Sequence, residues 1–183
     1  MNEKGSKNRN TTGGNDLYET NPKYIDDLFI YEKYENDGTY FEPCYGLNKY
    51  LYNKLKENFD NVDGGDILDG NDFLEYDENN KVDYIITNPP FNLSLEFILK
   101  MFKVVNKKFS LLVPLSYLDT MKRYYIFHNN DFKCKNILIY SKRISFKKGG
   151  GLPDKNLTGM SFCWITWDKE YKGDTTIKWI KNF

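Results

Sequence analysis

The sequence predicts an α/β fold in which a doubly wound, mostly parallel sheet ends in a C-terminal antiparallel edge hairpin. Apolar runs of strand length alternate with stretches of helical periodicity between residues 23 and 128. Strands that alternate with helices pair in parallel, because each helix returns the chain to the same end of the sheet. The last two apolar runs, residues 137–144 and 160–167, have no helix pattern between them, which favours antiparallel pairing.

The elements before residue 80 are short. Pro22 favours a helix over residues 23–34, because proline is accepted in a first helical turn. Residues 39–44 are expected to form a buried strand. A helix follows, because apolar side chains recur at helical spacing at Leu47, Leu51, Leu55 and Phe59. A weak strand is expected over residues 62–67, where two glycines interrupt the pattern, and Phe73-Leu74 is expected in an extended segment.

From residue 82 the pattern is clearer. Residues 82–87 form an apolar run of strand length, and residues 95–105 carry an apolar helix face. The next strand is expected over residues 109–115 and the next helix over residues 120–128. A basic, glycine-rich loop over residues 145–159 joins the two final strands.

Length and composition fit one domain. Residues 1–14 are almost free of apolar side chains, so we expect a flexible basic tail followed by a single domain over residues 15–183. No apolar run approaches the ~20 residues of a membrane helix, and the start of the chain lacks the apolar stretch of a secretory signal. We therefore expect a cytoplasmic protein without membrane contact. The cysteines, Cys44, Cys134 and Cys163, are widely spaced, so we expect no metal site.

The charges divide along the chain, although the formal net charge is +0. Residues 1–99 contain 9 Lys and Arg against 20 Asp and Glu, and residues 100–183 contain 17 against 6. Such a division indicates that one part of the surface meets a polyanion. The alternative is that the lysine-rich half is merely well solvated.

The tetrapeptide Asn88-Pro89-Pro90-Phe91 follows the predicted strand over residues 82–87. In a doubly wound sheet ligands bind beyond the carboxyl ends of the strands, so these residues are candidates for catalysis. The Asn88 side chain and the Pro89 carbonyl can accept hydrogen bonds from an exocyclic amine, and Phe91 can stack on a flat ring. The alternative is a rigid turn that ends the strand.

This tetrapeptide resembles the catalytic motif Asp/Asn/Ser-Pro-Pro-Tyr/Phe/Trp of the class I methyltransferases that modify adenine in DNA. Upstream, residues 41–48 resemble the cofactor loop of that family, and Tyr18-Glu19-Thr20-Asn21-Pro22 resembles its N-terminal motif. The motif order is that of the gamma group, and compact phage and prophage enzymes look most similar. The resemblance implies a Rossmann-like fold, S-adenosylmethionine as cofactor, and methyl transfer to the exocyclic amine of an adenine that leaves the DNA duplex.

The resemblance also implies roles for individual residues. Glu42 would pair with the amino group of the cofactor, and Asp66 would bind the ribose hydroxyls, with Asp63 as a competing candidate. Asp72 would accept from the cofactor's adenine amine, and Phe73 would pack on its ring. The implied cofactor contacts are Tyr18, Thr20, Glu42, Pro43, Cys44, Gly46, Asp66, Asp72, Phe73 and Asn88.

Three departures from the family pattern matter. Asn48 stands where the cofactor loop usually has a second glycine, the helix between the second and third strands is nearly absent, and we expect no separate recognition domain. DNA would then be contacted by loops and tails, and Arg143, Lys147 and Lys148 are the candidates. The alternatives are a methyltransferase acting on another planar amine, in ribosomal RNA or a protein glutamine, and a binding module that has lost catalysis.

Overall fold

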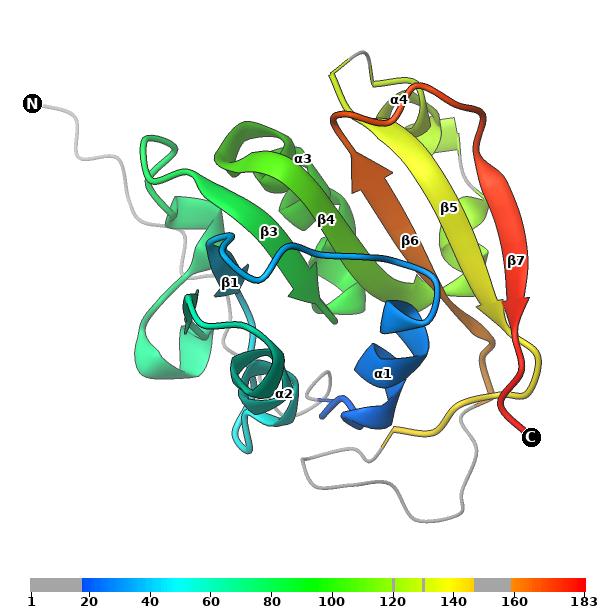
Figure 1. Cartoon of the computed structure of the whole chain (residues 1–183). Coiled ribbons are helices and arrows are strands. Elements are labelled where there is room, and N and C mark those ends of the chain that lie inside the picture. Colours follow the sequence, from blue (N-terminus) through cyan, green and yellow to red (C-terminus); the bar gives the residue numbers. More distant parts are fainter. Residues whose placement is uncertain (1–17, 120, 130, 147–158) are drawn as a thin grey trace, which may run out of the picture.

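A computed structural model describes residues 18–119, 121–129, 131–146 and 159–183 (Figure 1). Within these residues seven strands form one sheet in the order β2-β1-β3-β4-β6-β5-β7. The strands are β1 (Tyr40–Glu42), β2 (Val62–Gly64), β3 (Val82–Thr87), β4 (Val105–Pro114), β5 (Lys133–Tyr140), β6 (Phe162–Asp168) and β7 (Thr176–Ile180). The helices are α1 (Lys23–Phe29), α2 (Tyr50–Asn58), α3 (Ser94–Val104) and α4 (Tyr124–Phe127). Short 3-10 turns are η1 (Ile67–Asp69), η2 (Phe73–Glu75), η3 (Phe91–Leu93), η4 (Leu115–Leu118) and η5 (Met121–Arg123).

The predicted fold class is confirmed. Strands β1 to β4 pair in parallel, and β6 runs antiparallel to both β4 and β5. The predicted antiparallel pair is therefore β5 with β6. An additional strand, β7, pairs in parallel with β5 and occupies the edge of the sheet. Strand β7 was not predicted, because the sequence of residues 176–180 has no continuous apolar run and four of these five residues are exposed.

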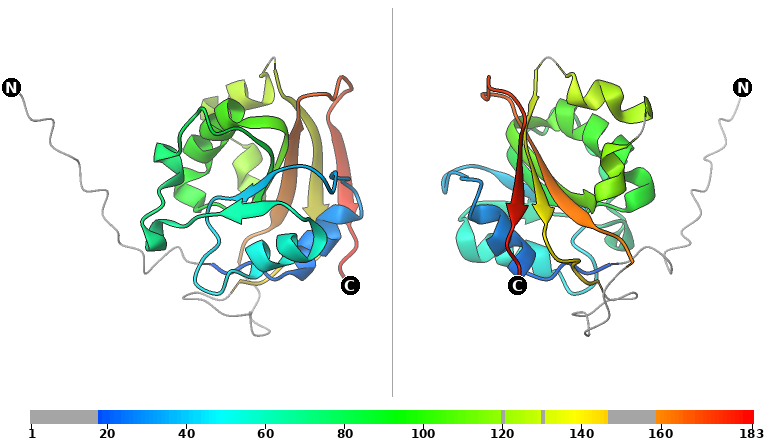
Figure 2. Two further views of the ribbon diagram at one scale, coloured as in Figure 1. Left: turned by 60° about the vertical axis from the view of Figure 1, so that its left-hand side comes forward. Right: turned by 90° about the vertical axis from the view of Figure 1, so that its right-hand side faces the viewer.

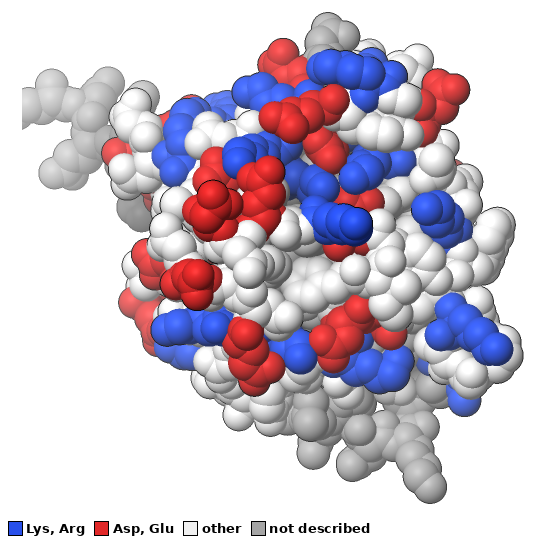
Figure 3. All heavy atoms as spheres, viewed as in Figure 1, with Lys and Arg blue, Asp and Glu red and all other residues white. Residues whose placement is uncertain are grey.

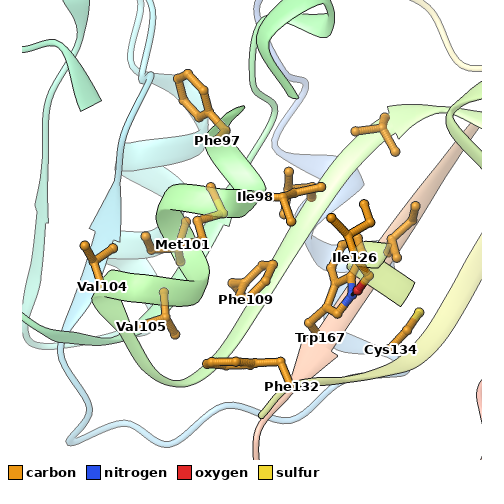
Figure 4. Close-up of a cluster of buried hydrophobic side chains, with 14 of the residues drawn as sticks. Phe97, Ile98, Met101, Val104, Val105, Phe109, Ile126, Phe132, Cys134 and Trp167 are labelled. Atoms are coloured by element: carbon orange, nitrogen blue, oxygen red, sulfur yellow. Dashed lines mark hydrogen bonds between the residues drawn. The ribbon is translucent and has the colours of Figure 1, made fainter. Parts of the chain in front are cut away.

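Helices cover both faces of the sheet, as the views in Figures 1 and 2 show. Helices α1 and α2 pack on one face, where Leu28 and Leu55 contribute to a buried cluster. On the other face α3 and α4 pack over β4 and β6. Figure 4 shows Ile98 and Met101 of α3 on the same side of the sheet as Phe109 and Trp167. The two cores explain why the predicted strands read as nearly continuous apolar runs.

Several predicted boundaries are wrong, each for a local reason. Helix α1 ends at Phe29 and not near residue 34, because Glu32 turns inward to pair with Lys108. Leu47 lies exposed in the turn before α2 and not on its apolar face. Phe73-Leu74 lies in the 3-10 turn η2 and not in an extended segment, because the Asp72 side chain caps that turn.

A second boundary difference concerns the basic half of the chain. Strand β5 starts at Lys133 and ends at Tyr140, before the predicted end at residue 144, and the predicted helix over residues 120–128 is divided between η5 and α4.

No helix among the described residues has the length and apolar character needed to cross a membrane.

Four charged side chains form a partly buried group at the amino ends of β4 and β5, which we call the amino-end charge cluster. Its members are Glu32, Lys108, Lys135 and Asp168. Each lysine ammonium lies within 2.9 to 3.5 Å of oxygens of both carboxylates. The cluster ties the segment after α1 to the sheet.

The chain order creates a crevice at the opposite end. From β1 the chain moves outward to β2, and then returns past β1 to β3 on its other side. Connections therefore leave the carboxyl ends of β1 and β3 in opposite directions. Ligands of open α/β sheets bind at such a point.

Candidate functional site

Residues at the carboxyl ends of β1 and β3 meet in one hydrogen-bonded group. Glu42 ends β1 and Thr87 ends β3. The Thr87 hydroxyl donates to Glu42 Oε1 over 2.6 Å, and the Cys44 backbone N–H donates to the same oxygen over 3.1 Å. The Cys44 sulfur lies 2.9 Å from Thr87 Oγ1. The cofactor loop and the strand that carries the candidate catalytic motif are thus connected directly.

Glu42 is fully buried, and only one of its oxygens is used. Its Oε2 atom has no hydrogen-bond partner among the described residues. Burial raises the pKa of Glu42 from 4.5 to about 8, although hydrogen bonds from Thr87 and Cys44 oppose this shift. A buried carboxyl with a free oxygen is a suitable partner for a cationic group, because an opposite charge stabilises the ionised form.

Asn88 has a similar free atom. Its Nδ2 donates to Thr20 Oγ1 over 3.0 Å and to the Tyr18 carbonyl over 3.4 Å. Its Oδ1 is buried and has no partner in the part of the chain that the structure describes. An unpaired buried acceptor costs about 1–3 kcal/mol, and Oδ1 is available to accept a hydrogen bond from water or from a ligand's donor.

Phe91 is only half-buried, but another ring covers one of its faces. The ring of Tyr18 stacks on Phe91 with centroids 5.6 Å apart and planes 15° apart. The ring of Phe162 lies beside Phe91 at 5.5 Å. A planar ligand that stacks on this face of Phe91 must therefore displace Tyr18.

The loop over residues 41–48, which resembles a cofactor loop, depends on a glycine. Gly46 has φ +67°, and a Cβ atom there would lie 2.9 Å from Glu19 Oε1. The Gly46 N–H donates to Asp66 Oδ2 over 2.8 Å. The Asn48 N–H donates to Glu19 Oε1 over 2.8 Å, so the residue that departs from the family pattern is held by the buried Glu19.

A cavity of about 410 Å³ lies beside this loop. Its size is within the range of about 300–1,000 Å³ that small-ligand sites occupy. The predicted residues Pro43, Asp72 and Phe73 line it, and so does the competing candidate Asp63. The full lining is Phe41, Pro43, Asp63, Gly64, Gly65, Gly70, Asn71, Asp72, Phe73, Glu75 and Tyr76.

Asp66 has a different position from the one predicted for a ribose ligand. It is absent from the cavity lining, and its two oxygens accept the backbone N–H groups of Gly46 and Leu68. It therefore holds the loop and the turn η1 in place. Asp63 is exposed beside the cavity, and its Oδ1 accepts only the N–H of Gly64 among the bonds between described residues.

The candidate nucleic-acid residues lie only partly within the described structure. Arg143 is exposed just after the carboxyl end of β5, at the same end of the sheet as Asn88. Lys147 and Lys148 lie outside the described residues, as does the tail over residues 1–14. On the face seen in Figure 3, Lys and Arg side chains alternate with Asp and Glu and form no single-sign field.

Two residues of the site were not singled out from the sequence. Thr87 joins Glu42 to Cys44, and Glu19 holds Asn48. A hydroxyl residue at the carboxyl end of an apolar strand was a usable signal for Thr87. Glu19 gave no such signal, because its contact to Asn48 joins segments that are distant in sequence.

Solved structures with similar folds include several methyltransferases. A modification subunit of a putative type I restriction enzyme from Vibrio vulnificus YJ016 aligns with a TM-score of 0.64 and 13% identity, over 91% of this chain and 47% of that chain. The chain has a methyltransferase fold. The M protein of the type I restriction enzyme EcoKI aligns with a TM-score of 0.55 and 16% identity, over 82% of this chain and 43% of that chain. This methyltransferase fold thus spans about half the length of these two subunits.

The fold is shared with proteins named for different substrates. A putative RNA methyltransferase from Pyrococcus horikoshii aligns with a TM-score of 0.56 and 16% identity, over 81% of each chain. No protein-family model and no curated protein matches the sequence. The structural likeness therefore shows a methyltransferase fold. It does not identify a substrate.

Proposed function

We propose that this protein transfers a methyl group from S-adenosylmethionine to the exocyclic amine of adenine in DNA. The observation that carries the proposal is the pair of buried, unpartnered oxygens at the switch point of the sheet, Glu42 Oε2 and Asn88 Oδ1. One suits a cationic ligand and the other suits an amine donor. Both lie at the end of the sheet where the fold binds ligands.

The residues around the cavity fit the cofactor. Glu42 would hold the positively charged amino group, and Asp63, which borders the cavity, would hold the ribose hydroxyls in place of Asp66. Asp72 and Phe73 line the cavity that the adenine ring would occupy. When bound, the cofactor would supply a methyl group attached to a positively charged sulfur, and the sulfur would keep the electron pair of the broken carbon–sulfur bond.

The residues of the motif would position the acceptor. Asn88 Oδ1 and the Pro89 carbonyl would accept hydrogen bonds from the amine, which directs the nitrogen lone pair toward the methyl carbon. The amine gains the methyl group and loses one proton to solvent. Positioning of this kind can contribute about 7–11 kcal/mol to catalysis.

Phe91 would stack on the target base after Tyr18 moves from its face. The base has to leave the DNA duplex first, at a cost of a few kcal/mol. Arg143, Lys147 and Lys148 would contact phosphates. The excess of basic side chains over residues 100–183 favours a nucleic acid over a protein glutamine as substrate. An RNA base remains the second candidate, and the neighbour named as an RNA methyltransferase favours keeping it in the test.

The proposal is tested by offering labelled S-adenosylmethionine with duplex DNA, single-stranded DNA, ribosomal RNA and protein fractions. We expect label in DNA, recovered as N6-methyladenine after digestion. Label confined to RNA or protein would replace the proposed substrate, and a protein that binds the cofactor but transfers nothing would be an inactive relative.

Replacing Asn88 by Ala tests the catalytic role within that assay. Loss of one oriented acceptor should lower the transfer rate at least tenfold, about 1.4 kcal/mol, with cofactor affinity nearly unchanged. Asn58→Ala, at an exposed site on α2, is the matched control. An Asn88→Ala rate above about a tenth of wild type would contradict the role.

A further inference from the structure

We infer that Thr20 is a positioning residue for Asn88, which rests on the proposed function. Its hydroxyl oxygen accepts a hydrogen bond from Asn88 Nδ2. Together with the Tyr18 carbonyl, which fixes the way the amide faces, it holds Oδ1 toward the incoming amine. In the sequence analysis Thr20 was considered only as a cofactor contact. The contacts of the segment Tyr18–Thr20 assign it this additional task.

The orientation of the Asn88 amide follows from its neighbours. The Tyr18 carbonyl, 3.4 Å from Nδ2, can only accept a hydrogen bond. Thr20 Oγ1, at 3.0 Å, gives the shorter contact on the same side. If the amide turned over, Oδ1 would face the Tyr18 carbonyl, and two acceptors would oppose each other. The nitrogen therefore points to Tyr18 and Thr20, and Oδ1 points away from them.

The segment is itself anchored, so Thr20 has a defined place. Thr20 is 5% exposed and Glu19 is 3% exposed. Glu19 Oε1 accepts from both the backbone N–H and the Nδ2 of Asn48, over 2.8 and 3.3 Å. The Tyr18 ring stacks on Phe91. The segment Tyr18–Thr20 thus contacts the loop over residues 41–48 and the side chains of Asn88 and Phe91.

The test compares Thr20→Val, which keeps the shape but removes the acceptor, with Thr20→Ser, which retains it. We expect Thr20→Val to lower kcat about tenfold while the KM for S-adenosylmethionine changes less than threefold. Thr20→Ser should recover most of that loss. Thr166→Val is the matched control, because it removes a buried hydroxyl that bonds Ser110 Oγ at 2.6 Å within the sheet.

A second readout does not depend on activity. The side-chain amide protons of Asn88, identified by their absence in Asn88→Asp, should exchange slowly with water in the wild type. Their exchange should be at least about tenfold faster in Thr20→Val and nearly unchanged in Thr20→Ser. If the wild type transfers no methyl group, the proposed function fails and these resonances still decide the inference. Thr20→Val with wild-type exchange overturns the inference, and so does a Thr20→Val variant whose only kinetic change is in KM.

Discussion

At the amino ends of β4 and β5, Glu32 and Asp168 each lie within 3.5 Å of two lysine ammonium groups, whereas at the carboxyl ends of β1 and β3 two buried oxygens have no partner among the described residues. Both regions bury polar groups in the same sheet. Asn136 Oδ1 is the one atom beside the amino-end charge cluster that also lacks a described partner, although its Nδ2 donates to Glu32.

The difference separates polar groups that are paired within the fold from buried oxygens for which we propose a partner in a ligand. A buried charge is tolerated when opposite charges and hydrogen bonds surround it, and removing one partner is then costly. An unpaired buried acceptor lowers stability instead, so replacing it should leave stability unchanged or raise it. Substitutions at the amino end should therefore change unfolding, and substitutions at the carboxyl end should change binding.

The largest expected effect is at Lys108. Lys108→Met leaves Lys135 as the one lysine of the amino-end charge cluster, and we expect the free energy of unfolding to fall by about 3–5 kcal/mol. Equilibrium unfolding in urea measures this free energy. Lys107→Met is the control, because Lys107 pairs with Glu35 on the surface and should change the midpoint far less. Equal shifts for the two variants would mean that the cluster does not hold the fold.

At the carboxyl end, Asp63 and Asp66 can be separated. Asp63→Asn should weaken S-adenosylmethionine binding by about 1.5–3 kcal/mol, measured by calorimetry, without changing the melting temperature. Asp66→Asn, in contrast, should lower the melting temperature, because two backbone N–H groups lose a charged acceptor. Unchanged affinity in Asp63→Asn would return the ribose role to Asp66.

Glu42 should make cofactor binding depend on pH. With a pKa of about 8 it is mostly protonated at neutral pH, yet pairing with a cationic amino group requires the ionised form. Affinity should therefore rise with pH, by at most tenfold per unit, and level off above about pH 8. Titrations by calorimetry between pH 6 and 9 measure this dependence, which should disappear in Glu42→Gln.

The stability of the cofactor-free protein should change with pH in the opposite direction. The folded-state pKa of Glu42 lies above its ordinary value of 4.5, so the folded state binds the proton more tightly than the unfolded state. This contribution is fully present below about pH 4.5 and is lost as the pH rises through 8. A wild type and a Glu42→Gln variant with parallel stability profiles over this window would contradict the assignment.

The smallest effect is expected for the basic loop. If Lys147 and Lys148 neutralise phosphates, replacing both by Ala should flatten the plot of log affinity against log salt by about two units. Replacing the exposed Lys169 and Lys172, which lie beyond the carboxyl end of β6 near the amino-end charge cluster, serves as the control. An unchanged slope in the loop variant would direct attention to Lys4, Lys7 and Arg9.

Much of this arrangement could be predicted from the sequence. The strand over residues 82–87 and the helix over residues 95–105 agree closely with β3 and α3, because long apolar patterns need no information from distant residues. The place of Asn88-Pro89-Pro90-Phe91 at the end of a buried strand follows from the same pattern. Strand β7 could not be predicted in this way, since its stability comes from pairing with β5 and not from an apolar run.

By itself, the sequence determined the fold class and predicted the end of the sheet at which a ligand binds, because hydrophobic periodicity and the succession of helices and strands are local properties of the chain. Only the tertiary structure decided which oxygens of Glu42 and Asn88 remain free, because that depends on contacts with Thr87 and with Thr20. It also decided that Asp66 holds a loop while Asp63 borders the cavity. These outcomes depend on hydrogen bonds between segments that are distant in sequence, and no local pattern encodes them.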